Sequence, residues 1–272
     1  MTTTLRPTEP LQHAADGARS RHYRVCVNGR PVGELRLRTH PVFGPSAAVV
    51  EDLRVDEADR GRGRATVAAL AAEEIARGWG CARVEAEVPA GTAAALRLAT
   101  ALGYRHRNRT LEKTVDTAPR LPPGSAGRPM TEAEFGPWLA ALKERYASSW
   151  ADRGVPVDEA RAKSERDHDR LLPAGLASDD VVLSVLEHEG VPVGTLWLSV
   201  AGERGFVYYV EADARFRGRG HGRTLMLLAE AQTSAAGKPV LALNVFTGNA
   251  PAERLYESLG YRPVTYSMYK EL

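Results

Sequence analysis

Apolar residues recur along the chain with the two periods that mark strands and helices. In the C-terminal half, five short apolar or alternating runs predict strands, and a Gly-Val-Pro turn between the first two is typical of a hairpin. These runs cover residues 181–187, 193–200, 206–211, 240–245 and 264–269. A stripe of Leu225, Leu228 and Ala229, broken at Gln232, predicts a helix after the third strand, and residues 250–258 predict another.

Two further helices are predicted ahead of those strands. Residues 130–150 carry a helical pattern that Thr131 opens as an N-cap, with Glu134 three residues on as in a capping box. Residues 157–172 predict the second helix of the pair. Helices that cover the faces of such a sheet predict an α+β fold.

The N-terminal half predicts the same order of elements without the two front helices. Its strands are expected near Tyr23, Val32 and Val49 and at residues 83–88, and its last helix over residues 93–102. The helix before that final strand is expected to bury a stripe of Val67, Leu70, Ala71 and Ile75.

The two halves also match residue by residue. The segment RGRGRA at Arg60–Ala65 matches RGRGHG at Arg217–Gly222, 157 positions later. Arg97–Tyr104 matches Arg254–Tyr261 at the same spacing of 157, so the two blocks keep one register without a gap. Ordered matches of this kind predict a duplicated domain.

Segments rich in chain breakers set the expected boundaries. Residues 1–20 are polar and interrupted by proline, which predicts a flexible arm. Residues 117–129 (TAPRLPPGSAGRP) predict a linker. The expected organisation is therefore a truncated N-terminal domain over residues 21–116 and a complete C-terminal domain over residues 130–272.

Composition is that of an ordinary globular protein. The chain is 43% hydrophobic and 26% charged, and its net charge of +2 is too small to favour nucleic acid as a partner. No run approaches the ~20 apolar residues of a membrane span, and the N-terminus lacks a signal-peptide pattern. Cys26 and Cys81 form no paired motif, and no Cys/His cluster occurs, so we expect buried thiols, a cytoplasmic location and no metal. The sequence leaves open whether the chain forms a homodimer.

The chemistry concentrates in a glycine loop between the third strand of the C-terminal half and the next helix. Gly218, Gly220 and Gly222 allow backbone N–H groups to converge, and the helix adds about +0.5 charge at that end. Charged donors that match phosphate geometry come from Arg215, Arg217 and Arg219. The loop lacks the Lys of a P-loop and the GxGxxG spacing of a dinucleotide site, so we expect another kind of pyrophosphate site.

The C-terminal half resembles the GNAT superfamily of N-acetyltransferases. That family carries [Arg/Gln]xxGlyx[Gly/Ala] for the CoA pyrophosphate, which Arg217, Gly220 and Gly222 match. It also carries an Asn and a helix ending in Leu-Tyr-x-x-x-Gly-[Phe/Tyr], which residues 249–261 (NAPAERLYESLGY) match in full. The resemblance covers nearly the whole chain as a tandem pair. It implies two domains, each a mixed, mostly antiparallel sheet flanked by helices.

The resemblance implies acetyl-CoA as cosubstrate and an amine acceptor that attacks the thioester directly. In the family a tyrosine at the position of Tyr256 protonates the leaving thiolate, an Asn like Asn249 binds the pantetheine arm, and a backbone N–H near Val210 or Glu211 stabilises the oxyanion. Contacts with CoA are expected from Val210, Arg215, Arg217, Gly218, Arg219, Gly220, His221, Gly222, Arg223, Asn249 and Tyr256. Glu211 is the best-placed general base, with Tyr208, Tyr209 or a water chain as alternatives.

The N-terminal copy departs from this pattern. It keeps a glycine loop at Arg60–Ala65, but Thr92 and Ala99 stand where the C-terminal copy has Asn249 and Tyr256. We therefore expect catalysis in the C-terminal copy alone.

The acceptor is left open by the sequence. One alternative is a small thiol-sugar amine, as in mycothiol-synthase-like acetyltransferases, and another is CoA sensing without turnover. The groove is expected at the front helices, where its candidate lining residues are Tyr146, Trp150, Trp197, Asp167 and Asp169.

Overall fold

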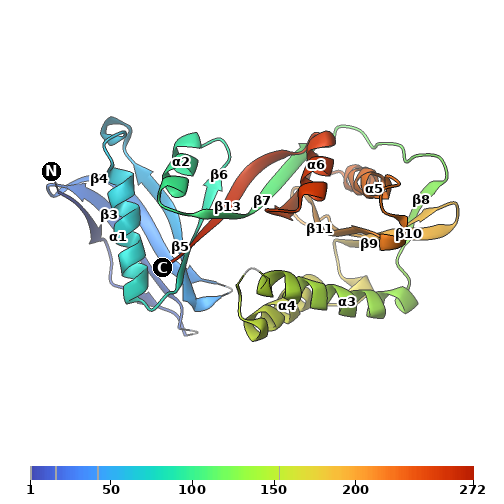
Figure 1. Ribbon diagram of the computed structural model, residues 1–272, viewed down its shortest axis with the longest axis horizontal. Coiled ribbons are helices and arrows are strands. Elements are labelled where there is room, and N and C mark those ends of the chain that lie inside the picture. The colour runs from blue at the N-terminus through green and yellow to red at the C-terminus, as the bar shows by residue number, and fades with distance from the viewer. Residues whose placement is uncertain (1, 16, 42, 153) are drawn as a thin grey trace. The chain divides into compact units, whose positions relative to one another are not determined.

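The structure is a computed structural model that describes residues 2–15, 17–41, 43–152 and 154–272. Its contacts group into two units, each built on a mixed sheet with helices (Figure 1). The N-terminal unit comprises Met1–Arg109 and Pro263–Leu272, and the C-terminal unit comprises Thr110–Arg262. The predicted α+β class and the predicted order of elements are therefore confirmed.

The N-terminal unit has antiparallel strands that lead into one parallel strand. Its strands are β1 (Thr3–Pro7), β2 (Gln12–His13), β3 (Arg19–Val27), β4 (Arg30–His40), β5 (Gly44–Val55) and β6 (Arg83–Pro89). Strands β1, β3, β4 and β5 pair antiparallel in that order, and β6 runs parallel to β5. The helices of this unit are η1 (Glu57–Asp59), α1 (Arg64–Gly78) and α2 (Ala93–Ala101).

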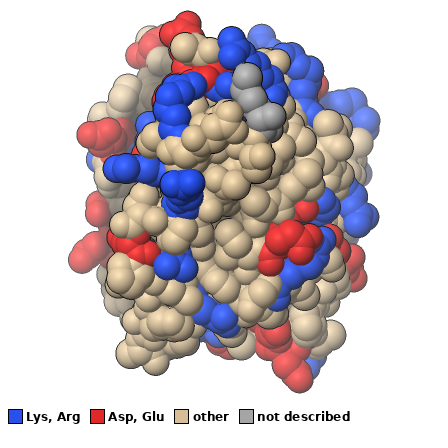
Figure 2. All heavy atoms as spheres, turned by 90° about the vertical axis from the view of Figure 1, so that its left-hand side faces the viewer, with Lys and Arg blue, Asp and Glu red and all other residues tan. Residues whose placement is uncertain are grey.

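The buried face of α1 differs from the expected stripe. Val67 and Leu70 are 41% and 43% exposed, whereas Ala68, Ala72 and Ala76 are fully buried. Small alanine side chains let the helix lie close to the sheet. The buried face of α1 is therefore the one that packs most closely, although Val67 and Leu70 on its other side are more hydrophobic. Figure 2 shows one side of this unit, where charged groups of both signs surround a broad uncharged area.

Two segments expected to be irregular contain strands. Residues 3–7, in the expected arm, form β1, which pairs with β3 and packs Leu5 against the core. Residues 125–129, in the expected linker, form β8, which pairs with β9. A Cβ on Gly127 of β8 would meet Leu228 at 2.5 Å, so a residue that indicated a linker instead allows close packing.

The C-terminal unit places helices on both faces of its sheet. Its strands are β8 (Ser125–Pro129), β9 (Val181–His188), β10 (Val191–Ser199), β11 (Gly205–Ala212) and β12 (Val240–Phe246). Its helices are α3 (Glu132–Ala151), α4 (Val157–Leu171), η2 (Gly175–Ala177), η3 (Ala214–Phe216), α5 (His221–Ala235) and α6 (Ala250–Ser258). The capping box of Thr131 and Glu134 opens α3 as predicted.

Alternation along the strands assigns the two faces of this sheet. Val210 packs in the cluster that contains Leu225 and Leu228 of α5, which confirms the predicted stripe of that helix. Tyr209, the preceding residue, packs against Trp138 of α3 in a separate cluster. Helices α5 and α6 therefore cover one face and α3 and α4 the other, as Figure 1 shows.

The last strand of each repeat contributes to the other repeat's unit. Strand β13 (Arg262–Glu271) follows α6 but pairs antiparallel with β6 of the N-terminal unit, and its Met268 lies in that unit's core. Strand β7 (Arg105–Thr114) follows α2, and its Leu111 lies in the core of the C-terminal unit. By contacts, the C-terminal unit thus ends at Arg262. The domain boundaries inferred from sequence describe the repeats and stay a prediction.

Two further features of the described residues bear on the sequence analysis. Cys26 and Cys81 are free thiols, 2% and 5% exposed, as expected. Among the residues that the structure describes, no helix is long and apolar enough to cross a membrane.

Candidate functional site

A gap opens between the two central strands of the C-terminal unit. Strand β11 pairs with β12 only from Gly205 to Val207, and the rest of β11 continues beyond this pairing. Opposite β10, the register shifts so that Trp197 pairs with Tyr209 and Leu198 with Val207, which leaves Tyr208 as a bulge. A bulge bends its strand and disrupts the ladder locally. The pairing of β11 with β12 has also ended before Val210, whose backbone N–H was expected to stabilise the oxyanion.

The glycine loop and α5 begin beside this gap. Gly220 is the N-cap of α5 with φ of 85°, and Gly218 has φ of 77°. A Cβ at either position would meet no atom within 4 Å, so the space in front of the helix is open. The first N–H groups of a helix have no partner inside it and attract anions. Gly222 lies beside α6, where a Cβ would make an ordinary contact of 3.4 Å with Leu255.

The basic side chains around the loop differ in their contacts. Arg217 is 69% exposed and lies 4.0 Å from a Glu211 oxygen. Arg215 makes a bidentate ion pair with Asp213, and its guanidinium also lies over the Phe216 ring, as that of Arg219 does. Arg217 and Arg219 can turn to an anion at little cost, whereas Arg215 must first leave Asp213.

Two other residues expected to contact CoA are held by the protein. His221 is buried between the rings of Phe216 and His188, and this burial lowers its pKa. Its ring is therefore less suited to bring a positive charge to an anion. Arg223 donates from Nη2 to the Ser258 hydroxyl at 2.5 Å, which ties the start of α5 to α6.

Helix α6 carries the two polar residues of the family motif. Asn249 caps it, and its Oδ1 accepts from Ala252 N–H at 3.4 Å, which leaves the amide NH₂ for a ligand. Tyr256 is 6% exposed in the same apolar cluster as Val210. Burial raises its pKa to about 12, so its hydroxyl stays protonated at neutral pH.

Glu211 lies on the opposite face, toward α3. Its Oε2 accepts from the Tyr209 hydroxyl at 2.5 Å and pairs with Arg145 Nη1 at 2.9 Å. Its side chain is 32% exposed, so water or an acceptor can reach it. Burial and the neighbouring Glu211 raise the pKa of Tyr209, which makes Tyr209 a donor to Glu211 and not a base at neutral pH.

Helices α3 and α4 bring most of the expected groove residues together. Tyr146 of α3 donates to Asp167 of α4 at 2.9 Å, and its ring lies 6.1 Å from that of Trp150. The ring of Trp197 on β10 lies 5.0 Å from that of Tyr208, the bulged residue, in a tilted arrangement. Asp169 differs, because it is 73% exposed and pairs with Lys143 on α3.

Residues that the sequence did not single out complete this side. Lys163 pairs with Asp167 at 2.5 Å, and its Nζ lies 4.9 Å from the centre of the Trp150 ring. His168 is buried between the rings of Tyr146 and Trp197, and burial lowers its pKa. On α4, Lys163 lies one helical turn before Asp167, and His168 follows Asp167 directly.

The N-terminal unit keeps the gap but changes its surroundings. Strand β5 pairs with β6 only through Val50, the residue 157 positions before Val207, and Gly63 caps α1 with φ of 73° as Gly220 caps α5. Arg64 next to it is buried and ion-paired with Asp59, so it is turned into the protein.

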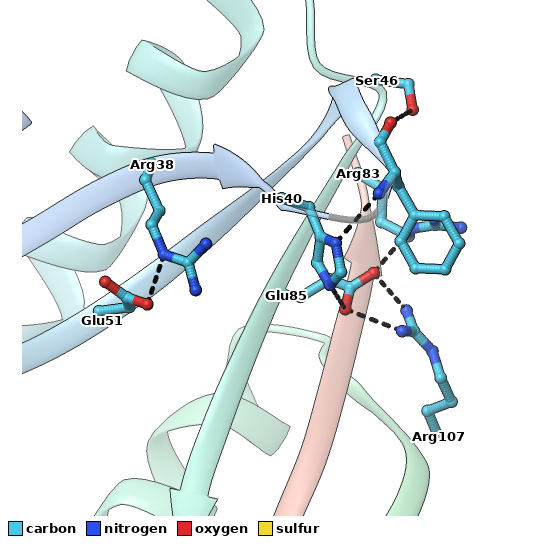
Figure 3. Close-up of polar contacts among 8 residues, drawn as sticks. Arg38, His40, Ser46, Glu51, Arg83, Glu85 and Arg107 are labelled. Carbon is cyan, nitrogen blue, oxygen red and sulfur yellow. Dashed lines mark hydrogen bonds and ion pairs between the residues drawn. The ribbon is translucent and has the colours of Figure 1, made fainter. Parts of the chain in front are cut away.

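An ionic cluster replaces apolar residues on the other sheet face of the N-terminal unit (Figure 3). Arg107 donates to both oxygens of Glu85, at 2.8 and 2.6 Å, and Arg83 and His40 lie within 3.5 Å of the same carboxylate. Glu85 lies 157 positions before Ala242, in the register of the repeat. Strand β6 therefore carries charged side chains at positions where the corresponding strand β12 of the C-terminal unit is apolar.

No group of three or more His, Cys, Asp or Glu side chains able to hold a metal occurs within the described ranges.

The family model described as "Acetyltransferase (GNAT) family" matches residues 2–104 and 139–261. A mycothiol acetyltransferase of Acidothermus cellulolyticus is 30% identical over 248 residues, which cover 82% of this chain and 70% of that protein. An uncharacterised N-acetyltransferase of Bacillus subtilis, YdgE, is 28% identical over 149 residues, which cover 53% of this chain and 95% of that protein.

Solved structures show the same fold. A GCN5-related N-acetyltransferase from Sphaerobacter thermophilus has a TM-score of 0.59 at 21% identity and covers 92% of this chain and 80% of its own. A tandem GNAT protein from the clavulanic acid biosynthesis pathway has a TM-score of 0.52 at 18% identity and covers 95% of this chain and 85% of its own.

Proposed function

Because the chain belongs to the acetyltransferase (GNAT) family, we propose that its C-terminal unit transfers an acetyl group from acetyl-CoA to a primary amine. The observation that carries the proposal is that this one unit has an open glycine loop before α5, a gap after Val207 and the motif residues Asn249 and Tyr256 on α6. Tyr256 packs in the same cluster as Val210 of β11, and Arg223 ties α5 to α6. The N-terminal unit has a gap and a loop but has Thr92 and Ala99 in place of Asn249 and Tyr256.

The fit of acetyl-CoA rests on open space at the glycine loop and on a part of β11 that does not pair with β12. The pyrophosphate would lie at the start of α5, where Gly218 and Gly220 leave room and Arg217 and Arg219 are exposed. The pantetheine arm would lie along β11 beyond Val207, where the pairing with β12 has ended and the Asn249 amide is available.

In the proposed reaction, two residues of the site each move one proton. The neutral amine attacks the thioester carbon, a C–N bond forms and the C–S bond breaks. The N–H of Val210 stabilises the charge that develops on the oxygen. Glu211 takes the proton that the amine loses, directly or through water, and the Tyr256 hydroxyl donates its proton to the departing sulfur. Solvent then returns a proton to Tyr256, and Glu211 releases its own.

A matched pair of glycine variants tests the assignment. Gly220→Glu and Gly63→Glu change helix N-caps with similar φ, 85° and 73°, and neither new side chain meets a neighbour within 4 Å of Cβ. Backbone strain is therefore alike in the two variants. We expect Gly220→Glu to abolish acetyl-CoA binding in calorimetry and turnover, and Gly63→Glu to keep most turnover. The reverse result would assign catalysis to the N-terminal unit.

A second candidate is mycothiol acetyltransferase activity, with a small thiol-sugar amine as acceptor. Relatives with that name are about 30% identical over most of this chain. Turnover of acetyl-CoA with a cysteinyl-sugar amine, simple primary amines and N-terminal peptides separates the acceptors. Binding of acetyl-CoA without turnover of any amine would favour a CoA-sensing module.

A further inference from the structure

A buried carboxylate in the C-terminal unit is held by a lysine on β7 and by a tyrosine that lies between α6 and β13. The Glu230 side chain on α5 is 4% exposed. Lys113 Nζ on β7 donates to both of its oxygens at 2.8 Å, and the Tyr261 hydroxyl donates to one at 3.1 Å. Because a buried carboxylate without a cation is costly, Lys113 is what allows Glu230 to hold Tyr261.

Tyr261 connects this cluster to Tyr256. The two ring centroids lie 6.0 Å apart in an edge-to-face arrangement, and Tyr261 N–H donates to the Tyr256 carbonyl at 3.0 Å. Both rings are buried, Tyr261 completely. The position of the Tyr256 ring therefore depends on a neighbour whose hydroxyl is fixed by Glu230.

The N-terminal unit repeats this cluster but has Ala99 in the place of Tyr256. Lys270 on β13 donates to Glu73 on α1 at 2.6 Å, and the Glu73 side chain is 2% exposed. Tyr104 lies beside Glu73, which together with burial raises the pKa of the Tyr104 hydroxyl. Tyr104 N–H donates to the carbonyl of Ala99, at 3.0 Å.

The two clusters correspond residue by residue. Glu73, Tyr104 and Lys113 stand 157 positions before Glu230, Tyr261 and Lys270. In each unit the lysine comes from the exchanged strand, so it belongs to the other repeat. The N-terminal repeat thus supplies the cation of the cluster that touches Tyr256.

We propose that Lys113 is a positioning residue for Tyr256 and acts through Glu230 and Tyr261. The inference rests on the proposed role of Tyr256 as proton donor. It gives the N-terminal repeat a part in catalysis that does not require a second reaction site, because β7 completes the site of the C-terminal unit.

A double-mutant cycle tests the proposal in the full chain. We expect Lys113→Met to lower kcat about tenfold with little change in the KM for acetyl-CoA, because a small displacement of a reacting group slows proton transfer. On the Tyr256→Phe background the same change should lower kcat less than twofold, since the hydroxyl it positions is gone. Lys113→Arg, which keeps the cation, should restore most of the activity.

Lys270→Met is the matched control. It leaves an equivalent buried carboxylate, Glu73, without its cation, but in the unit that has Ala99. We expect a loss of thermal stability similar to that of Lys113→Met with kcat retained. The Lys113→Met/Glu230→Gln variant removes the unpaired charge and carries the same cycle if Lys113→Met folds poorly.

Two results would overturn the inference. One is an unchanged kcat in Lys113→Met, and the other is an equal loss on the wild-type and Tyr256→Phe backgrounds. A wild-type kcat in Tyr256→Phe would instead show that Tyr256 is not the acid, and the positioning role of Lys113 would fail with it. The single variant therefore separates failure of the proposed function from failure of the positioning role.

Discussion

At the residue scale, Tyr256 carries the most specific prediction. Tyr256→Phe keeps the buried ring and removes the hydroxyl, so we expect kcat to fall about 10²-fold with little change in the KM for acetyl-CoA. Steady-state kinetics with a competent acceptor measure this. Tyr23→Phe, which removes a buried hydroxyl from the N-terminal unit, is the control and should keep kcat. An unaltered kcat in Tyr256→Phe would assign the residue to packing.

The raised pKa of Tyr256 also predicts the shape of the pH profile. Burial disfavours the charged phenolate and places the pKa at about 12, so the hydroxyl remains a donor throughout the neutral and mildly alkaline range. We expect kcat/KM to rise with pH as the amine acceptor loses its proton, with no fall below about pH 10. Tyr256→Phe should show the same shape at lower amplitude. A fall near pH 9 that disappears in Tyr256→Phe would contradict the pKa.

At the element scale, His168 lies where α4 packs against Trp197 of the sheet. Its Nδ1 donates to the Ser164 carbonyl at 2.7 Å, and its ring lies 5.7 Å from that of Trp197. Burial lowers its pKa below the ordinary value of 6.5, so between that value and the folded pKa the unfolded chain binds a proton that the folded chain does not. This contribution to the free energy of unfolding is absent above pH 6.5 and destabilises progressively below it.

His168→Gln should therefore reduce the pH dependence of stability. We expect its free energy of unfolding, measured by denaturant titration, to fall less steeply between pH 6.5 and pH 5 than that of the wild type. His13→Gln replaces an exposed histidine and should keep the wild-type slope. Identical slopes for wild type and His168→Gln would show that His168 does not titrate differently on unfolding.

At the scale of the whole molecule, the exchanged strands predict where mutations act. Met268→Ala should cost about 2–5 kcal/mol, because the side chain is 1% exposed in a packed core. Although Met268 belongs to the C-terminal repeat, we expect hydrogen exchange to speed up in α1 and β6. Leu111→Ala, the counterpart 157 positions earlier, should instead loosen α5 and β12. If Met268→Ala instead reduced the protection of α5 from hydrogen exchange, the assignment of β13 to the N-terminal unit would be contradicted.

Local patterns were enough to predict most elements and the family motifs. Residues 250–258 form α6 as expected, and the glycine loop lies between β11 and α5, because turn chemistry and helical periodicity are properties of neighbouring residues. The repeat at a spacing of 157 predicted two similar units before any contact was known. The site residues follow from the motif, and their proposed roles remain to be tested by the variants above.

Contacts between residues far apart in the sequence were decided only by the tertiary structure. Strand β7 reads RHRNRTLEKT, and only Arg107 and Leu111 of it are buried, so alternation gives no signal; its alignment with β13 at the repeat spacing would have found it. Which unit β7 and β13 join depends on pairing between strands, which no local pattern encodes. The buried face of α1 and the Lys113–Glu230 pair depend likewise on close packing and charge burial, which exist only once the chain has folded. The partly exposed Arg145–Glu211 pair depends on α3 lying beside β11.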